Sequence, residues 1–373
     1  MRYLLPILLL FACQGQEKIE DHSDDESATG TTEQAADNPH NTNNSSESSA
    51  VDTPAEVQEL PPTPSYPSRD IPVIFDTDAN NEIDDQHALA YLLLNEATFN
   101  VLGITVNATR NGGQIEQHYE EAERVIQLCG HAPEELLYTG ANADFNTIRS
   151  QTAQGSYDGQ EAVEFIIATA RQYDDHRLAL VPVGKLTNIA LALMLAPDIK
   201  DKVRIVWLGA NYPGPGEYNL DNDIPAMNYV LEQDVPFEMV TVRYSDGTGS
   251  AAVRVTPAEM QARMPGLGPR VATAVPGRNG GEFQHFGDYS ISLFENLELH
   301  GTPPGRSLFD VVALAIMKNP EWGKQYLLSS PTYVDGQWVD RPENERLITV
   351  WENFDKAAIL DDFFNSLQVE APQ

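Results

Sequence analysis

Five acidic residues follow a short apolar run near residue 76, and their spacing is the strongest chemical signal in the sequence. The run from Ile71 to Phe75 is typical of a buried parallel strand, and the acids after it are Asp76, Asp78, Glu82, Asp84 and Asp85. An apolar segment with helical spacing continues to Leu93, and Asn81 is its expected N-cap. This order places carboxylates at the carboxyl edge of a sheet, where open α/β folds bind ligands. Carboxylates this close repel one another unless a cation or proton intervenes, so the loop predicts a cation site.

Three kinds of cation chemistry begin with such a loop. An EF-hand starting at Asp76 would need a glycine where Asn81 stands and a bidentate acid where His87 stands. A phosphatase of the haloacid dehalogenase type also begins with a strand and an Asp-x-Asp, but it gives no role to the Asp84–Asp85 pair. The stretch resembles most closely the nucleoside hydrolase signature, in which a strand, an Asp-x-Asp, a short gap and an Asp-Asp precede an apolar helix.

Four downstream segments resemble the same family, in the family's order. Leu180–Ala190 (LVPVGKLTNIA) is similar to its Gly-Pro-Leu-Thr-Asn element, with Lys185 in the place of proline. Trp207–Asp223 is similar to the segment that contains Glu-Phe-Asn, and Val106–Gly113 (VNATRNGG) to a loop whose asparagine contacts sugar. Arg306–Ile316 is similar to the segment with the family's last aspartate, although Phe309 stands where the family has a histidine.

The resemblance implies hydrolysis of the N-glycosidic bond of a ribonucleoside or related N-ribosyl compound. It implies a Ca²⁺ ion held by Asp78, Asp85, Asp310 and the backbone carbonyl of Val183. It makes Asp84 the general base, and it assigns the sugar hydroxyls to Glu217, Asn219 and either Asn107 or Asn111. We expect Asp76 and Asn80 to support the loop.

Two departures from the family bear on the substrate. The gap between Asp-x-Asp and Asp-Asp is five residues, Ala79 to Ile83, where three are usual. The missing histidine at Phe309 removes one candidate acid for the departing base. His285, with Tyr289 one turn later on the same expected helix face, is the candidate that replaces it.

A hypothesis from another class is a lipoprotein that binds a ribosyl or sugar ligand through the same cation without turning it over. An Asp-x-Asp phosphatase is less favoured, because it does not explain Asp310 or the segment around Glu217. Asp84 favours the enzyme, since a binding protein has no need of a base beside the metal.

The first 70 residues indicate export. Met1–Cys13 has one basic residue before an apolar stretch too short to span a bilayer, and its last four residues, Leu10 to Cys13, resemble a bacterial lipobox. We therefore expect a signal peptide, lipidation at Cys13 and a lipid anchor in the cell envelope, on the outer membrane and facing the periplasm or the surface. Residues 14–70 are acidic and poor in apolar residues, as expected for a disordered tether.

The remaining residues, 71–373, predict one α/β domain with a mostly parallel sheet covered by helices on both faces. Expected strands are 71–75, 99–106, 178–183, 204–208, 235–240, 332–334 and 347–350. Expected helices are 115–129, 160–173, 186–195, 226–233, 282–297 and 308–317. The formal net charge of −33 argues against nucleic acid as a partner. The resemblance implies that the ligand is a small nucleoside or riboside. Whether the protein forms a homo-oligomer stays open.

Overall fold

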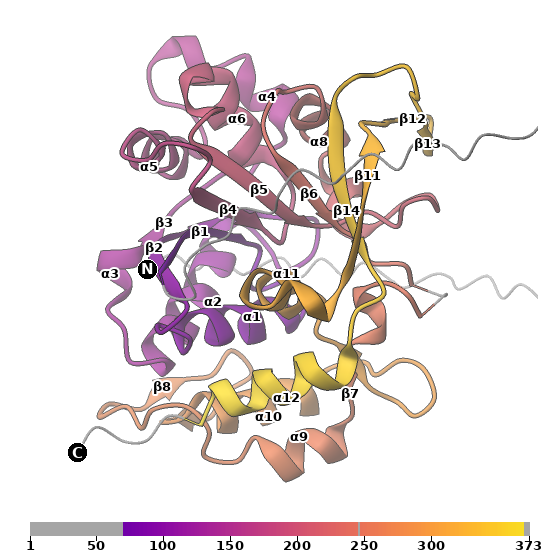
Figure 1. The fold of residues 1–373 in the computed structure, drawn as a ribbon. Helices are drawn as coiled ribbons and strands as arrows, with labels where there is room; N and C mark the ends of the chain where they lie inside the picture. The colour runs from indigo at the N-terminus through magenta and orange to yellow at the C-terminus, as the bar shows by residue number, and fades with distance from the viewer. Residues whose placement is uncertain (1–69, 245–246, 369–373) are drawn as a thin grey trace, which may run out of the picture. The chain divides into compact units, whose positions relative to one another are not determined.

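A computed structural model describes residues 70–244 and 247–368 (Figure 1). The predicted signal peptide, the lipidation site Cys13 and all of the predicted tether except Asp70 lie outside the described residues. Among the residues that are described, no helix is both long and apolar enough to cross a membrane.

An eight-stranded sheet forms the centre of the described region, in the order β11-β14-β6-β5-β4-β1-β2-β3 (Figure 1). Its strands are β1 (Ile71–Thr77), β2 (Phe99–Val106), β3 (Leu137–Tyr138), β4 (Leu178–Pro182), β5 (Val203–Leu208), β6 (Phe237–Val240), β11 (Lys324–Ser329) and β14 (Leu347–Glu352). Neighbouring strands run parallel except at the edge, where β11 is antiparallel to β14. The prediction of a mostly parallel sheet is confirmed.

Within residues 70–244 and 247–368, three two-stranded sheets lie outside the central one. They pair β7 (Arg254–Val255) with β10 (Arg306–Ser307), β8 (Val275–Pro276) with β9 (Glu282–Phe283), and β12 (Thr332–Val334) with β13 (Gln337–Val339). The first and second of these carry residues that matter for the site.

Helices cover both faces of the central sheet, because its strands are apolar on both sides. In β1, Val73 and Phe75 belong to one core cluster and Ile74 to the other. The first cluster includes α1 (Asp84–Leu93), α2 (Ile115–Leu128), α9 (Pro257–Arg263), α10 (Phe286–Glu295), α11 (Phe309–Lys318) and α12 (Lys356–Ser366). The second includes α4 (Phe145–Arg149), α5 (Gln160–Ala170), α6 (Thr187–Leu195) and α8 (Ile224–Leu231).

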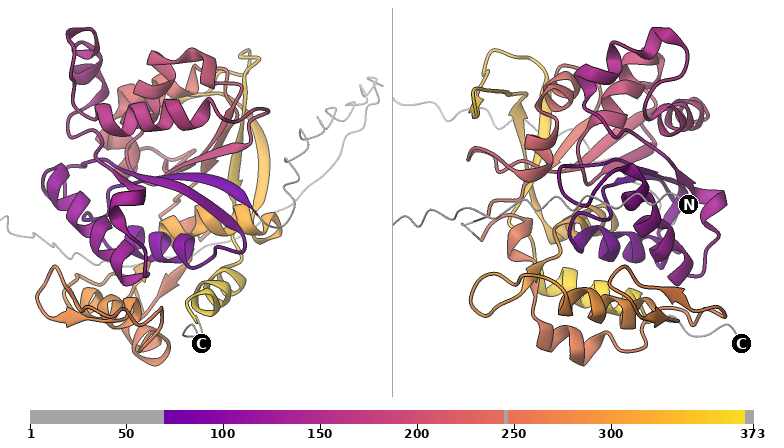
Figure 2. Two further views of the ribbon diagram at one scale, coloured as in Figure 1. Left: turned by 90° about the vertical axis from the view of Figure 1, so that its left-hand side faces the viewer. Right: turned by 180° about the vertical axis from the view of Figure 1, so that it is seen from behind.

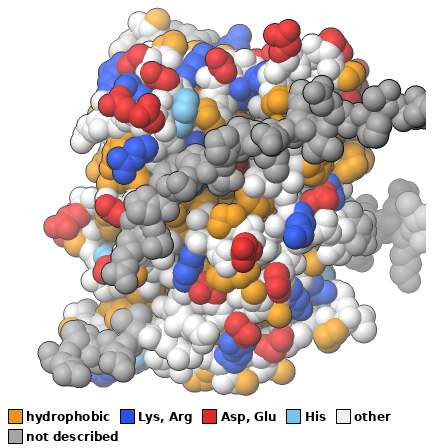
Figure 3. All heavy atoms as spheres, viewed as in Figure 1, with side chains coloured by type: hydrophobic (Ala, Val, Ile, Leu, Met, Phe, Trp, Pro, Cys, Tyr) orange, Lys and Arg blue, Asp and Glu red, His pale blue; other side chains and the backbone are white. Residues whose placement is uncertain are grey.

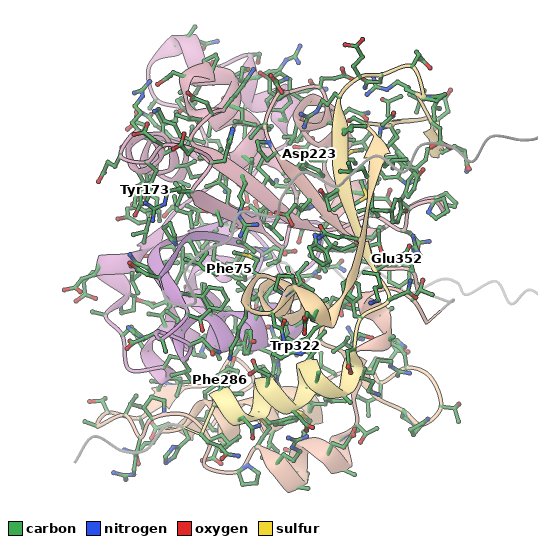
Figure 4. The ribbon with its side chains drawn as sticks, viewed as in Figure 1. Phe75, Tyr173, Asp223, Phe286, Trp322 and Glu352 are labelled. Carbon is green, nitrogen blue, oxygen red and sulfur yellow. The ribbon has the colours of Figure 1, made fainter. Side chains whose placement is uncertain are left out.

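The first cluster is two helix layers deep. Figures 1 and 2 show α1, α2 and α11 next to the sheet, with α9, α10 and α12 beyond them. Phe75 of β1 and Phe286 of α10, both labelled in Figure 4, are buried members of this cluster. The other α-helices of the described residues are the short α3 (Pro133–Leu136) and α7 (Tyr218–Asn222). On the face drawn in Figure 3, acidic and basic side chains are interspersed.

Two local predictions were wrong. Asn81 is not the N-cap of the first helix, because α1 begins at Asp84 after Ile83. The predicted helix over 282–297 is shorter, since Glu282 and Phe283 pair with Pro276 and Val275 as a strand and α10 begins at Phe286. At Asn81 contacts with a distant segment override the local pattern, whereas at residues 282–283 a short hairpin with residues 275–276 replaces the first helical turn.

Candidate functional site

Three carboxylates from two helix starts form the centre of the site. Oxygen atoms of Asp84 and Asp85, at the start of α1, and of Asp310, in the first turn of α11, all lie within 4.8 Å of one another. All three residues are buried. Asp85 and Asp310 are 225 positions apart in the sequence, and they meet because α1 and α11 pack side by side on the same face of the sheet.

Asp78 joins this cluster through Asp85. The Oδ1 atom of Asp85 accepts hydrogen bonds from the Thr77 hydroxyl at 2.5 Å and from the Asp78 backbone N–H at 3.1 Å. The Oδ2 atom of Asp78 accepts one from the Thr109 hydroxyl, whereas its Oδ1 atom is buried without a hydrogen-bond partner. The Oδ2 atom of Asp310 is also buried and unpartnered.

These carboxyl groups are held in an environment that opposes their ionisation. Burial, followed by repulsion from neighbouring carboxylates, raises the pKa of Asp78, Asp84 and Asp310 well above the usual range. Burial raises the pKa of Asp85 to about 6, although the bond from Thr77 opposes the shift. A cation in the cluster would offset both burial and repulsion.

The donor set fits a hard divalent cation. Ca²⁺ binds carboxylate and backbone carbonyl oxygens, and the two unpartnered oxygens of Asp78 and Asp310 belong to this cluster of buried acids. Val183, whose carbonyl is the fourth predicted ligand, lines the same cavity, and this carbonyl accepts a 2.7 Å hydrogen bond from Asn219 Nδ2. The geometry also brings an oxygen of Asp84, predicted as the base, within 4.8 Å of an oxygen of Asp310.

A cavity of about 480 Å³ opens over the carboxylates, within the size range of small-molecule sites. Two predicted sugar ligands, Glu217 and Asn219, line it. The Oε2 atom of Glu217 accepts bonds from the backbone N–H groups of Ala210 and Leu220, both at 3.0 Å. These bonds fix the start of α7, so that Asn219 reaches the Val183 carbonyl.

The other predicted sugar ligands lie beside the cavity rather than in its lining. Asn107 is buried, donates from Nδ2 to Asp76 at 2.7 Å and has an unpartnered Oδ1. Asp76 also accepts from Thr105 and Asn188, so it ties β2 and α6 to β1, and its pKa is raised by burial to about 6. Asn111 is exposed, and its backbone N–H donates a hydrogen bond to the Tyr218 hydroxyl. Of the two, Asn107 is the one held against the acidic loop.

His285 does not reach the cavity. It is the N-cap residue of α10, its Nδ1 lies 3.2 Å from the Gly268 carbonyl oxygen, and it is not among the lining residues. Tyr289, predicted on the same face, donates to Glu121 at 2.6 Å. Phe309, which replaces the family's histidine, does line the cavity.

Sequence reasoning missed the contacts that hold the long acidic loop. Arg278, in the turn between β8 and β9, donates to Asn80 Oδ1 at 3.2 Å and to the Glu82 carbonyl at 2.9 Å. On the cavity side, the buried Arg306 pairs with the Glu82 carboxylate. Asn81 also lines the cavity, with a buried Oδ1 that has no partner. Nothing local in the sequence marks these partners, because they lie about 200 residues away.

The chain also matches known proteins. The profile of the family described as inosine-uridine preferring nucleoside hydrolase matches residues 73–361. The chain belongs to this family. Membership makes the chain a nucleoside hydrolase-like N-glycosidase, and the family depends on a metal.

Individual relatives of the chain are distant. Pyrimidine-specific ribonucleoside hydrolase RihB of Escherichia coli is 29% identical over 171 residues, which is 44% of this chain and 49% of RihB. An uncharacterized protein of Schizosaccharomyces pombe is 27% identical over 224 residues, 54% of this chain and 69% of that protein. The aligned parts thus span from about half to about two-thirds of these relatives.

Solved structures confirm the fold. The purine-preferring ribonucleoside hydrolase from Gardnerella vaginalis superposes with a TM-score of 0.60 at 22% identity, over 79% of this chain and 98% of that one. An inosine-guanosine nucleoside hydrolase gives a TM-score of 0.62 at 18% identity, over 82% and 100% of the two chains.

Proposed function

We propose that this nucleoside hydrolase cleaves the N-glycosidic bond of ribonucleosides with Ca²⁺ in the carboxylate cluster and Asp84 as the general base. The observation that carries the proposal is the convergence of Asp84, Asp85 and Asp310 below a cavity that Glu217 and Asn219 line. Those five side chains come from three separate segments. An acidic loop that served only solubility would not bury its carboxylates at such a place.

Each of these residues has a role in the proposed reaction. Asp78, Asp85, Asp310 and the Val183 carbonyl would hold the ion, which when bound would supply positive charge that acidifies water and orients sugar hydroxyls. Asp84 takes the proton of the attacking water. Glu217 and Asn219 bind sugar hydroxyls, and the two hydrogen bonds from Asn219 Nδ2 to Val183 and Leu208, at 2.7 and 3.1 Å, leave its Oδ1 for the ligand.

A panel of purine and pyrimidine ribonucleosides, incubated with the protein in calcium or in EDTA, tests this function. We expect free base and ribose in calcium, none in EDTA, and recovery when calcium is restored. Binding of nucleosides in calcium without any hydrolysis would replace the enzyme with a binding protein. Release of phosphate from phosphomonoesters, with no base release, would favour the phosphatase.

A further inference from the structure

The cavity carries an excess of negative charge that its own cations do not offset. Among the residues that the structure describes, six carboxyl side chains line it, and they are Asp78, Glu82, Asp84, Asp85, Glu217 and Asp310. Two guanidinium groups line it as well, and both are engaged. Arg306 pairs with Glu82, and Arg254 donates to the backbone carbonyls of His300 and Gly305. Even with a divalent cation bound, six carboxyl groups face four positive charges, so the cavity attracts a cationic ligand.

Two aromatic side chains add to this preference. Tyr244 and Phe309 both line the cavity, with ring centroids 6.1 Å apart and planes at 80°. The Tyr244 residue is 54% exposed and Phe309 is half-buried, so their rings are accessible to a ligand. The face of an aromatic ring attracts a cation. A flat, positively charged heterocycle in this cavity would therefore contact both aromatic ring faces and carboxylates.

The chemistry of the leaving group points in the same direction. When a neutral base departs, it takes the electron pair of the C1′–N bond and needs a proton. Phe309 cannot supply that proton, and His285 lies outside the cavity. Among the described lining residues, the one imidazole is that of the exposed His300. A base that already carries a positive charge departs as a neutral molecule and needs no acid.

We propose that the preferred substrate is an N-riboside with a cationic base of the pyridinium type, a proposal that rests on the proposed hydrolase function. In the reaction the C1′–N bond breaks and its electron pair neutralises the ring nitrogen. The water oxygen bonds to C1′, and the water proton passes to Asp84 and then to solvent. The products are ribose, a neutral pyridine and one proton.

Binding can be separated from turnover with a matched pair of ligands. N-ribosylnicotinamide is cationic, and benzamide riboside has nearly the same shape but is neutral and is not hydrolysed. In the Asp84→Asn variant with calcium, calorimetry should show the cation binding at least about tenfold more tightly. Adding Phe309→Leu should reduce that ratio severalfold. Equal affinity for the two ligands, or tighter binding of the neutral one, would overturn the proposal.

Turnover gives the second test. In the wild type, kcat/KM for N-ribosylnicotinamide should exceed that for inosine and uridine by at least about tenfold. Phe309→His, which restores the family's residue, should raise hydrolysis of inosine and lower kcat/KM for the cationic riboside, because it replaces a ring that the charged base contacts. His300→Ala should alter kcat/KM for neither inosine nor the cationic riboside. A loss of 100-fold or more on inosine in His300→Ala would make His300 the leaving-group acid and contradict the proposal.

The two proposals fail in different ways. Hydrolysis of inosine or uridine with none of N-ribosylnicotinamide would overturn the cationic preference and keep the proposed function. Absence of hydrolysis with every riboside would overturn the proposed function, and the calorimetric ratio would still decide whether the cavity selects for charge.

Discussion

Replacing Asp310 by asparagine should stabilise the metal-free protein and remove its response to calcium. Asp310 is buried, one of its oxygens has no partner, and oxygens of Asp84 and Asp85 lie within 4.8 Å. Two ionised carboxylates at that distance repel each other by about 3–4 kcal/mol at an effective dielectric constant of about 20. Protonation relieves part of this repulsion in the wild type. The net gain for Asp310→Asn should therefore be about 1–3 kcal/mol, or roughly 2–6 °C in the melting temperature.

Saturating calcium should reverse the order of the melting temperatures of the wild type and Asp310→Asn. A ligand at about 1,000 times its dissociation constant stabilises the native state by about 4.1 kcal/mol, which exceeds the expected gain of the variant, and the variant lacks one of the carboxylates that hold the ion. Differential scanning fluorimetry in EDTA and in calcium measures both effects. Asp361→Asn, a change at an exposed carboxylate of α12, is the control. It should change neither the melting temperature in EDTA nor the rise of that temperature in calcium. A variant that melts lower than the wild type in EDTA, or gains as much from calcium, would refute the reasoning.

Three further outcomes are expected. Arg278→Ala should weaken calcium binding at least severalfold, as measured by titration, because Arg278 positions the acidic loop through Asn80 and Glu82. An unchanged calcium affinity would show that Arg278 does not have this role. Cys129 is buried and burial raises the pKa of its thiol, so a thiol reagent should modify it only after denaturant is added, and rapid labelling of the native protein would contradict that burial. We propose export and lipidation at Cys13: the full chain expressed in bacteria should incorporate labelled fatty acid and Cys13→Ser should not, whereas an unlabelled wild type would rule the anchor out.

The sequence predicted the elements whose patterns are strong and local. Apolar runs such as Leu178–Pro182, in which every residue is buried, became strands within one residue of the expected bounds, because a strand buried on both faces must be apolar throughout. The position of the acidic loop at the carboxyl edge of the sheet followed from chain order alone. The meeting of Asp310 with Asp84 came from the resemblance to the family rather than from any local pattern.

Elements that depend on distant partners escaped prediction. Strand β11 at the antiparallel edge was missed because its assignment depends on pairing with β14. Asn81 was expected to cap a helix, yet the loop around it is fixed by Arg278 and the first helical residue is Asp84. The Arg306–Glu82 pair joins two segments that are more than 200 residues apart, and neither residue marks the other in the sequence.

Side-by-side kinetics of the wild type and Asp84→Asn test the central claim most directly. Asparagine keeps the size of the side chain but cannot accept the proton of water. In saturating calcium, the rate of base release should fall by about 10²–10⁴, while riboside affinity, measured by calorimetry, should stay within a few fold. That split would establish a hydrolase with Asp84 as its base. Hydrolysis in Asp84→Asn within a few fold of the wild type would contradict it.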